Sequence, residues 1–263
     1  MNDEIKTVRA GSFEMRYFCF GRGERIMVII PGVSIRSVME SAAAVKHAYK
    51  LFEDDFTVYV FDRVTDIPEG YTVFDMAEDT AAAMAALGIG DAYIMGASQG
   101  GVIGQIIAAR HPELVKKLAA AATASDNNEI SDGIFEKARA LAEEGRSREL
   151  NLLFAESIYS PEFFARYRTL IEEASALITA EDMKRFLRMT ADMNGFDLRE
   201  EQEKITCETL VVAGSEDRIF GADASRELAE RLGCELCVLE GFGHAVFDET
   251  DEFKKIVYRF FMR

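Results

Sequence analysis

The chain has 263 residues, 49% of them hydrophobic, and carries a formal net charge of −16 at pH 7. That length and hydrophobic content predict one α/β domain with an insertion, large enough to bury a full core. The acidic charge argues against nucleic acid or an anionic membrane as partner, and no apolar run approaches the roughly 20 residues that a membrane helix needs. Because the opening MNDEIK is acidic and no signal region follows it, we expect a cytoplasmic protein.

Before residue 125 the sequence alternates predicted strands and helices. Two antiparallel strands joined by a turn at residues 10–12 are followed by apolar runs typical of central parallel strands. In chain order, we predict strands over 4–10, 13–20, 26–30, 56–61, 92–95 and 118–122. We predict helices over 37–52, 75–87 and 102–110, the last of which ends at His111-Pro112.

Residues 125–203 have a different character, because amphipathic helical segments follow one another without a strand-like run. The predicted helices cover 131–144, 148–157, 161–176 and 181–193. A helical insertion between two strands of a parallel sheet is a lid by its position. Its apolar side chains either line a substrate pocket or form the lid's own core, which is the ordinary role of such a stripe; they are Leu152, Phe154, Phe163, Phe164, Tyr167, Phe186, Met189 and Met193.

The alternation resumes after this insertion. A strand is predicted over 209–213, then a helix over 222–232, a strand over 235–239 and a last helix from residue 252 onward. We therefore divide the chain into an α/β core of residues 1–124 and 204–263 and a helical lid of residues 125–203.

The stretch YIMGASQGGVIG, residues 93–104, is where we expect the chemistry. Gly96, Ser98 and Gly100 form a G-x-S-x-G pattern, which lets a strand turn sharply into a helix with the serine hydroxyl exposed at the carboxyl end of the sheet. A side chain in place of either glycine would collide with the neighbouring strand or helix. The five letters alone are a weak signal, but the predicted strand before them and the helix after them supply the context that this motif needs.

A serine hydroxyl needs a base within hydrogen-bond reach, and histidine is the side chain whose pKa suits the task. His47 lies inside a predicted surface helix, and His111 precedes a proline, where a capping role is the ordinary explanation. His244 follows the final predicted strand and has Gly241 and Gly243 beside it, so its loop can bring the imidazole over Ser98. We predict that His244 is the base.

The base in turn needs an acid that fixes its tautomer. Asp217 directly follows the strand TLVVA, at the edge of the sheet where the other strand-to-helix loops lie. Glu216 and Asp126 are weaker alternatives, and any of the three carboxylates could be solvated instead.

The negative oxygen that develops on an attacked carbonyl requires preorganised donors. The backbone N–H of Gln99, the residue after the nucleophile, is one candidate. The other is the amide of Val33, in the loop Pro31-Gly32-Val33 after the strand over 26–30. Pro31-Gly32 taken alone is also consistent with a plain turn.

The four cysteines are predicted to be buried or half-buried free thiols, because small free cysteines are usually found in protein cores. Cys234 and Cys237 form a C-x-x-C at the start of a predicted strand, whereas redox-active pairs lie at the start of a helix. No second cysteine pair at ligand spacing is present to complete a zinc site. The other two cysteines are Cys19 and Cys207. We do not expect the four to form an extracellular disulfide framework in a chain of this length with no predicted signal peptide.

The chain resembles the α/β-hydrolase fold family over essentially its whole length. The resemblance lies in the order Ser98, Asp217, His244, with Gly32 upstream and the helical insertion before residue 209. It includes incidental features such as Asp79, the His111-Pro112-Glu113 exit and the segment over 205–207. It implies a mostly parallel sheet flanked by helices, a nucleophile at Ser98, a base at His244, an acid at Asp217, oxyanion amides at Val33 and Gln99, and no cofactor or metal.

The chain departs from the family pattern in two loops. Many relatives carry His-Gly where this chain has Pro31-Gly32, which removes a contact that would support the oxyanion loop. The loop after residue 61 lacks the glycine and serine that many relatives place after Arg63. Both departures bear on the class of substrate.

We therefore predict a cofactor-free serine hydrolase acting on a small-molecule ester or similar acyl substrate through an acyl-enzyme. The alternatives are carbon–carbon bond hydrolysis or acyl transfer on the same triad, a ligand-binding sensor with negligible turnover, and a structural or interaction protein. A homodimer is compatible with the sequence, which does not specify the substrate or its acyl length.

Overall fold

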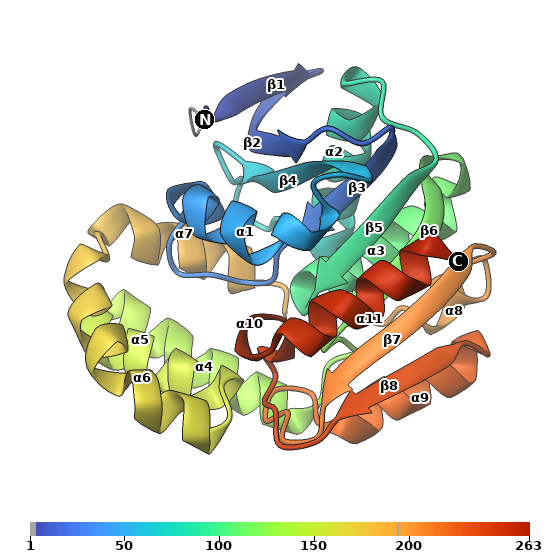
Figure 1. The fold of residues 1–263 in the computed structure, drawn as a ribbon. Helices are drawn as coiled ribbons and strands as arrows, with labels where there is room; N and C mark the ends of the chain where they lie inside the picture. The colour runs from blue at the N-terminus through green and yellow to red at the C-terminus, as the bar shows by residue number, and fades with distance from the viewer. Residues whose placement is uncertain (1–3, 194) are drawn as a thin grey trace.

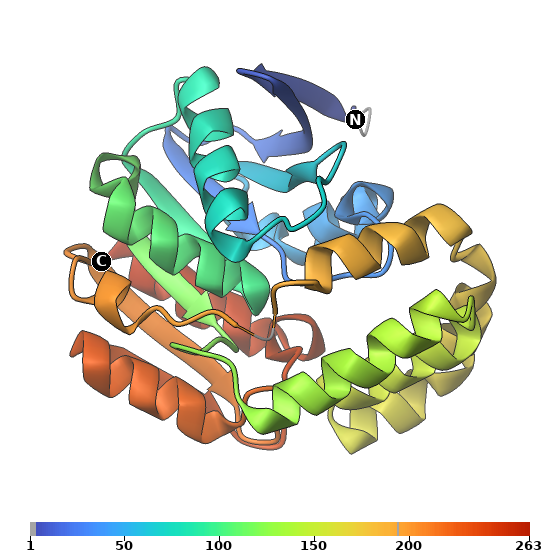
Figure 2. The same cartoon turned by 180° about the vertical axis from the view of Figure 1, so that it is seen from behind.

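The computed structural model describes residues 4–193 and 195–263 as a sheet covered by helices on both faces (Figures 1 and 2). The strands are β1 Lys6–Ala10, β2 Phe13–Gly21, β3 Arg25–Ile30, β4 Phe56–Val64, β5 Ala92–Ala97, β6 Val115–Ala121, β7 Glu208–Gly214 and β8 Glu235–Leu239. The helices of the core are α1 Ala42–Ala48, α2 Val73–Ala86, α3 Gln99–Arg110, α9 Ala222–Leu232, α10 Val246–Glu249 and α11 Asp251–Met262. Between β6 and β7 lie α4 Glu129–Glu143, α5 Ser147–Ile158, α6 Pro161–Ala174, α7 Ala180–Thr190 and α8 Arg199–Gln202.

The eight strands form one sheet in the order β1-β2-β4-β3-β5-β6-β7-β8. β2 pairs antiparallel with both β1 and β4, and every pairing from β4 to β8 is parallel. The carboxyl ends of β5, β6, β7 and β8 therefore meet at one edge of the sheet, and the loops that follow these strands are neighbours in space. The prediction of a mostly parallel sheet with flanking helices is confirmed.

Alternate side chains of the central strands enter two separate hydrophobic cores. Val28 and Ile30 of β3 pack in the core beneath α2 and α3, whereas Met27 and Ile29 pack in the core beneath α1 and α11. Both faces of the sheet are thus buried, which is why β3 and β5 are continuous apolar runs rather than alternating ones.

The inserted helices α4 to α7 extend from the sheet edge where the loops after β5 to β8 lie (Figures 1 and 2). Their buried faces pack together, as the contact between Phe154 of α5 and Phe186 of α7 illustrates, with ring centroids 5.8 Å apart. Phe154, Phe186, Met189 and Met193 belong to the core. The other predicted apolar residues are only partly buried; they are Leu152, Phe163, Phe164 and Tyr167. The division into a core and a lid remains a prediction.

The structure corrects the predicted extent of several elements, among them the helix over 37–52 and the strand over 56–61. The helix predicted over 37–52 is three pieces: a 3₁₀ turn at Val38–Ser41, α1, and a second 3₁₀ turn at Lys50–Phe52. The strand predicted over 56–61 continues to Val64, because β2 bulges between Met15 and Tyr17 and carries the antiparallel pairing on to Met15 and Val64. Residues Asp62 and Arg63 therefore lie in β4 and not in a loop.

All four cysteines are free and partly buried, as predicted, and burial raises the pKa of the Cys234 thiol to about 11. In the part of the chain that the structure describes, no helix combines the length and apolar character needed to cross a membrane.

Candidate active site

Ser98 lies at the junction between β5 and α3 in a strained backbone conformation. Its φ is 53° and its ψ is −121°, a combination that costs a non-glycine residue about 1 to 3 kcal/mol. The strain is held from both sides: Ser98 N donates to Ala121 O of β6 at 2.8 Å, and Ser98 O accepts from Gly101 N at 2.8 Å. The side chain of Ser98 is thereby fixed at the carboxyl edge of the sheet and at the first turn of a helix.

The glycines around Ser98 allow β3, β5 and α3 to approach one another closely. A Cβ on Gly100 would lie 1.9 Å from Ile30 O, and one on Gly96 would lie 2.3 Å from Gly100 O. Gly32 passes directly beside the serine, since a Cβ there would lie 3.0 Å from Ser98 Cβ and 3.6 Å from Ser98 Oγ. The loop after β3 is therefore within reach of any group bound to Ser98.

Asp217 and His244 form a buried pair on the loops that follow β7 and β8. Asp217 Oδ2 and His244 Nδ1 are 2.9 Å apart, and the two side chains are 0% and 4% exposed. The other carboxylate oxygen, Oδ1, accepts from Ile219 N at 2.8 Å and Phe220 N at 3.1 Å. The backbone thus fixes the Asp217 carboxylate so that Oδ2 faces the imidazole.

The electrostatics of this pair determine which ring nitrogen is free. Burial raises the pKa of Asp217, but the charge and hydrogen bond of His244 and the two backbone N–H groups outweigh it, so the pKa of Asp217 is lowered overall. An ionised carboxylate only accepts hydrogen bonds, so Nδ1 carries the proton that it shares with Oδ2. In neutral His244 the lone pair is then on Nε2, where it can accept a proton from a hydroxyl.

The loop that carries His244 is tied to its surroundings by backbone contacts. Glu216 N donates to Phe242 O at 2.9 Å, and a Cβ on Gly214 would lie 2.2 Å from Gly243 O. Ala245 N donates to Ile158 O of α5 at 2.8 Å. The base loop therefore rests on the end of β7 and on the inserted helices.

Asp217 and His244 are hydrogen-bonded to each other, but no hydrogen bond connects His244 to Ser98. Within the described residues, Ser98 Oγ makes no hydrogen bond. The alternatives lie elsewhere: Glu216 is exposed, and Asp126 is 3.9 Å from Arg199. His47 is exposed on α1, and His111 ends α3 with its Nε2 2.8 Å from Glu78 Oε2.

Sequence reasoning missed three polar residues around these loops. Arg63 donates to Pro31 O and to Gln99 Oε1, Asp62 accepts from Ser37 and Arg185, and Glu249 accepts from Gly243 N and Ser160 N. Asp62 and Arg63 follow a buried apolar run, which was a signal for a site at the carboxyl end of a strand. Glu249 had no such signal.

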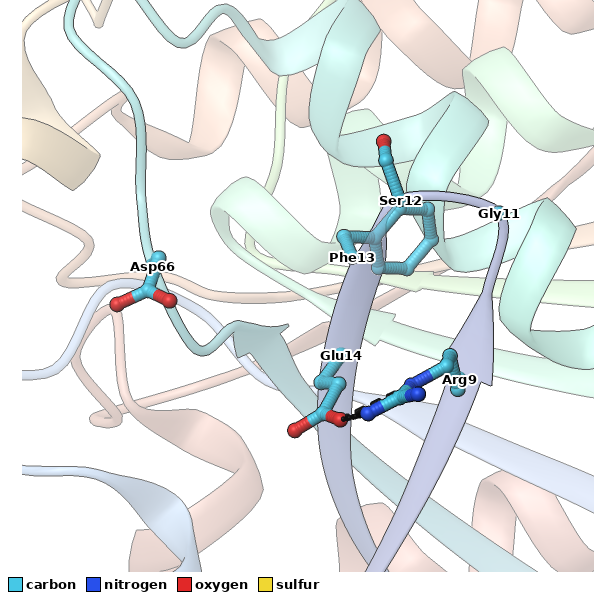
Figure 3. A pocket seen from close by; sticks show the side chains of 6 residues that line it. All are labelled: Arg9, Gly11, Ser12, Phe13, Glu14 and Asp66. Carbon is cyan, nitrogen blue, oxygen red and sulfur yellow. Dashed lines mark hydrogen bonds and ion pairs between the residues drawn. The ribbon is translucent and has the colours of Figure 1, made fainter.

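A separate pocket of about 370 Å³ lies at the β1–β2 turn and is lined by Arg9, Gly11, Ser12, Phe13, Glu14 and Asp66. Figure 3 shows Arg9 turned toward Glu14, with which it forms an ion pair across the hairpin. None of the predicted site residues lines this pocket. Among residues 4–193 and 195–263, no three His, Cys, Asp or Glu side chains are grouped as ligands for a metal ion.

Comparisons with known proteins agree with this architecture. Residues 37–251 match a family model described as alpha/beta hydrolase fold. A protein of Stutzerimonas stutzeri named "Putative carbamate hydrolase RutD" is 26% identical over 216 residues, which cover 77% of this chain and 80% of that protein.

Solved structures resemble the chain over nearly its full length. An alpha/beta hydrolase enzyme from a Medee basin deep-sea metagenome library superposes with a TM-score of 0.89 at 23% identity and covers 98% of both chains. The enol-lactonase from Burkholderia xenovorans superposes with a TM-score of 0.79 at 21% identity and covers 98% of this chain and 100% of its own. At these identities the likeness is one of fold.

Proposed function

The chain belongs to the alpha/beta hydrolase fold family, and we propose that it is a serine hydrolase in which Ser98 attacks the carbonyl of an ester or similar acyl substrate. The observation that carries this proposal is the buried Asp217–His244 pair, 2.9 Å between Oδ2 and Nδ1, on loops at the same sheet edge as the strained Ser98. A strained serine at a strand-to-helix turn and a histidine with a free Nε2 are the components that this chemistry needs.

In the proposed reaction, His244 Nε2 takes the proton of Ser98 Oγ as the oxygen bonds to the substrate carbonyl carbon. The backbone N–H groups of Val33 and Gln99 stabilise the oxyanion, helped by the N-terminal end of α3. The intermediate then collapses to an acyl-enzyme as His244 protonates the leaving group. Water, deprotonated by His244, releases the acid and restores Ser98, while Asp217 stabilises the imidazolium.

The inserted helices act as a lid in this proposal. A row of partly buried rings at the start of α6 supports it: the ring of Phe163 stacks on that of Tyr159, with centroids 4.6 Å apart, and is tilted against that of Tyr167, with centroids 4.5 Å apart. Tyr159 precedes Ser160, whose N donates to Glu249, and the same carboxylate accepts from Gly243 N in the His244 loop. We propose that this row of rings contacts the apolar part of a small acyl substrate. A cytoplasmic location is also part of the proposal.

A carbamate is the second candidate substrate, and the name of the curated relative favours it. Esters and carbamates both present a carbonyl with a leaving group, so the same residues could attack either. Carbon–carbon bond hydrolysis and acyl transfer remain alternative reactions of the same residues.

The test begins with labelling by a fluorophosphonate probe. Wild-type protein is expected to be labelled, and Ser98→Ala, which removes only the hydroxyl, is expected to show no labelling. Absence of labelling in folded wild-type protein would contradict an activated serine.

Substrate class is then separated by p-nitrophenyl esters of increasing acyl length and a p-nitrophenyl N-methylcarbamate. If esters are the substrates, we expect multiple turnovers with esters and one equivalent of p-nitrophenol from the carbamate. Equal steady-state rates would favour the carbamate. Labelling with no turnover of any compound would favour a ligand-binding sensor.

A further inference from the structure

The side chain of Arg63 is a buried cation that the proposed chemistry does not use. It is 3% exposed, and burial lowers its pKa to about 10, which leaves it charged near neutrality. Its Nη2 donates to Pro31 O at 2.8 Å and to Gln99 Oε1 at 2.9 Å. One nitrogen thus joins the loop after β3, which carries Val33, to the residue after Ser98.

The side chain of Gln99 continues this connection to the inserted helices. Gln99 is fully buried, and its Nε2 donates to Met189 O of α7 at 3.0 Å and contacts Met193 Sδ at 3.2 Å. The orientation of the amide follows from its partners, because a guanidinium only donates and a carbonyl only accepts. Gln99 is therefore held between Arg63 and α7.

Asp62 makes a second connection to the same helix. It accepts hydrogen bonds from Ser37 Oγ and from Arg185 Nη2 of α7, and it also accepts from Arg63 N at 2.8 Å. Arg185 in addition donates to Ser34 O at 3.4 Å, in the loop after β3. The last residues of β4 thus make hydrogen bonds to α7, to the loop after β3 and to the first residue of α3.

We propose that Arg63 is a positioning residue for the oxyanion hole, and that Arg185 and Asp62 couple its geometry to the seating of helix α7. The inference rests on the proposed function, since it concerns the amides of Val33 and Gln99. Arg63 binds Pro31, two residues before Val33, and also Gln99, which carries the second amide. It holds Pro31 and Gln99 at a fixed separation. It thereby supplies support to the oxyanion loop that the sequence, with Pro31 in place of histidine, was expected to lack.

A purely structural role makes a different prediction. Arg63→Met leaves Pro31 O and Gln99 Oε1 without this donor, which lowers the free energy of unfolding whatever the role of Arg63 in catalysis. If the network only held the fold together, Arg63→Met would change the free energy of unfolding and leave kcat of the folded protein unchanged. A positioning role requires in addition that kcat of the folded variant falls, because a displacement of about 1 Å at the oxyanion donors costs about 10²-fold in rate.

The experiment measures kcat, KM and thermal midpoint with the fastest p-nitrophenyl ester for Arg63→Met, Arg63→Lys and Gln99→Met. We expect Arg63→Met to lower kcat by about 10- to 100-fold with KM nearly constant, because the loss falls on the transition state. Arg63→Lys keeps one ammonium for both acceptors and is expected to restore part of the loss. Gln99→Met keeps its backbone N–H, so a loss of kcat there reports on position alone.

Coupling to α7 is tested by a matched pair on that helix. Arg185→Met is expected to lower kcat by about 2- to 30-fold. Arg188→Met is the control, because Arg188 donates to Ile67 O at 2.8 Å and contacts neither Asp62 nor Gln99. Unchanged kcat in Arg185→Met, or equal losses in both variants, would overturn the coupling.

The proposed function and this inference fail in distinguishable ways. If wild-type protein is not labelled by the fluorophosphonate, the proposed function fails. If wild-type protein is labelled and turns over but folded Arg63→Met and Gln99→Met match its kcat, only the inference fails. Should Arg63→Met not fold, Gln99→Met and Arg185→Met decide the question.

Discussion

At the scale of single residues, the two carboxylate oxygens of Asp217 bind different partners. Oδ1 is occupied by Ile219 N and Phe220 N, so the carboxylate cannot rotate, and Oδ2 is directed at His244 Nδ1. The acid is therefore defined by its loop as much as by its charge. Glu216, the neighbouring carboxylate, is exposed and lacks this backbone support.

We predict that Asp217→Asn slows fluorophosphonate labelling of Ser98 by about 10³- to 10⁴-fold. The amide nitrogen of asparagine can donate to Nδ1, which would favour the tautomer with its proton on Nε2 and leave no acceptor for the Ser98 proton. The measurement is the second-order labelling rate constant. Glu216→Gln is the control and is expected to label at the wild-type rate; a comparable loss in both variants would contradict the assignment of the acid.

The placement of Ser98, Asp217 and His244 at one edge of the sheet could be predicted from sequence, because each follows an apolar run. The side chains that support them could not. Arg63 and Gln99 are 36 positions apart, and Glu249 and Ser160 are 89 apart, so only the folded chain brings them together. The sequence also did not indicate that Ser98 Oγ would lack a hydrogen bond to His244.

At the scale of elements, the loop between β8 and α11 connects the base to the inserted helices. Glu249, at the end of α10, accepts from Gly243 N at 3.0 Å and from Ser160 N at 2.9 Å. Gly243 directly precedes His244, and Ser160 is the N-cap of α6. One carboxylate thus fixes both the base loop and the turn between α5 and α6.

We predict that Glu249→Ala lowers both the free energy of unfolding and the labelling rate. Each backbone N–H left without a partner costs about 1 to 3 kcal/mol, and the His244 loop loses its attachment. Glu249→Gln, which keeps a carbonyl acceptor, is expected to retain most of both quantities. Urea unfolding and labelling kinetics measure them, with the exposed Glu240→Ala as control. Wild-type labelling by Glu249→Ala would exclude a role in holding the base.

Element types could be predicted well where hydrophobic periodicity was strong, as in α9, Ala222–Leu232, and β8, Glu235–Leu239. The errors came from tertiary contacts. β4 extends to Val64 through its pairing with β2, and the helix predicted over 37–52 breaks at Tyr49, which is buried with Phe52. The four-residue helix α10 is too short for a periodic signal.

At the scale of the whole molecule, the parallel order of β5 to β8 brings three distant loops to one edge, and the whole chain carries a net charge of −16. Most ion pairs are exposed and contribute little to stability. Mutual repulsion among the excess carboxylates favours the unfolded chain, so the charge sets how stability depends on pH. Buried carboxyl groups modify that dependence in both directions.

Asp79 of α2 provides the test of this dependence. Burial raises its pKa above the ordinary value of 3.8, although the hydrogen bond from Tyr71 Oη at 2.7 Å opposes the shift. A raised pKa means that the folded state binds the proton more tightly, so stability rises as the pH falls from neutrality toward 3.8. The lowered pKa of Asp217 acts oppositely, but only as the pH falls through and below that same ordinary value.

We therefore predict that the urea midpoint of the wild-type protein rises as the pH is lowered from about 8 to about 5.5, a range that stays above the isoelectric point of 4.7. Asp79→Asn keeps an oxygen that can accept from Tyr71 but cannot ionise. It is expected to be more stable than wild type at pH 8 and to show a smaller rise as the pH falls toward 3.8. Asp75→Ala, on the exposed N-terminal turn of the same helix, is the control: it removes the same charge together with the acceptor of the capping bond from Thr72 N, so its midpoint should fall at both pH values. A midpoint for Asp79→Asn below that of wild type at pH 8 would mean that the Asp79 carboxylate stabilises α2, and would reverse the sign argued from its burial.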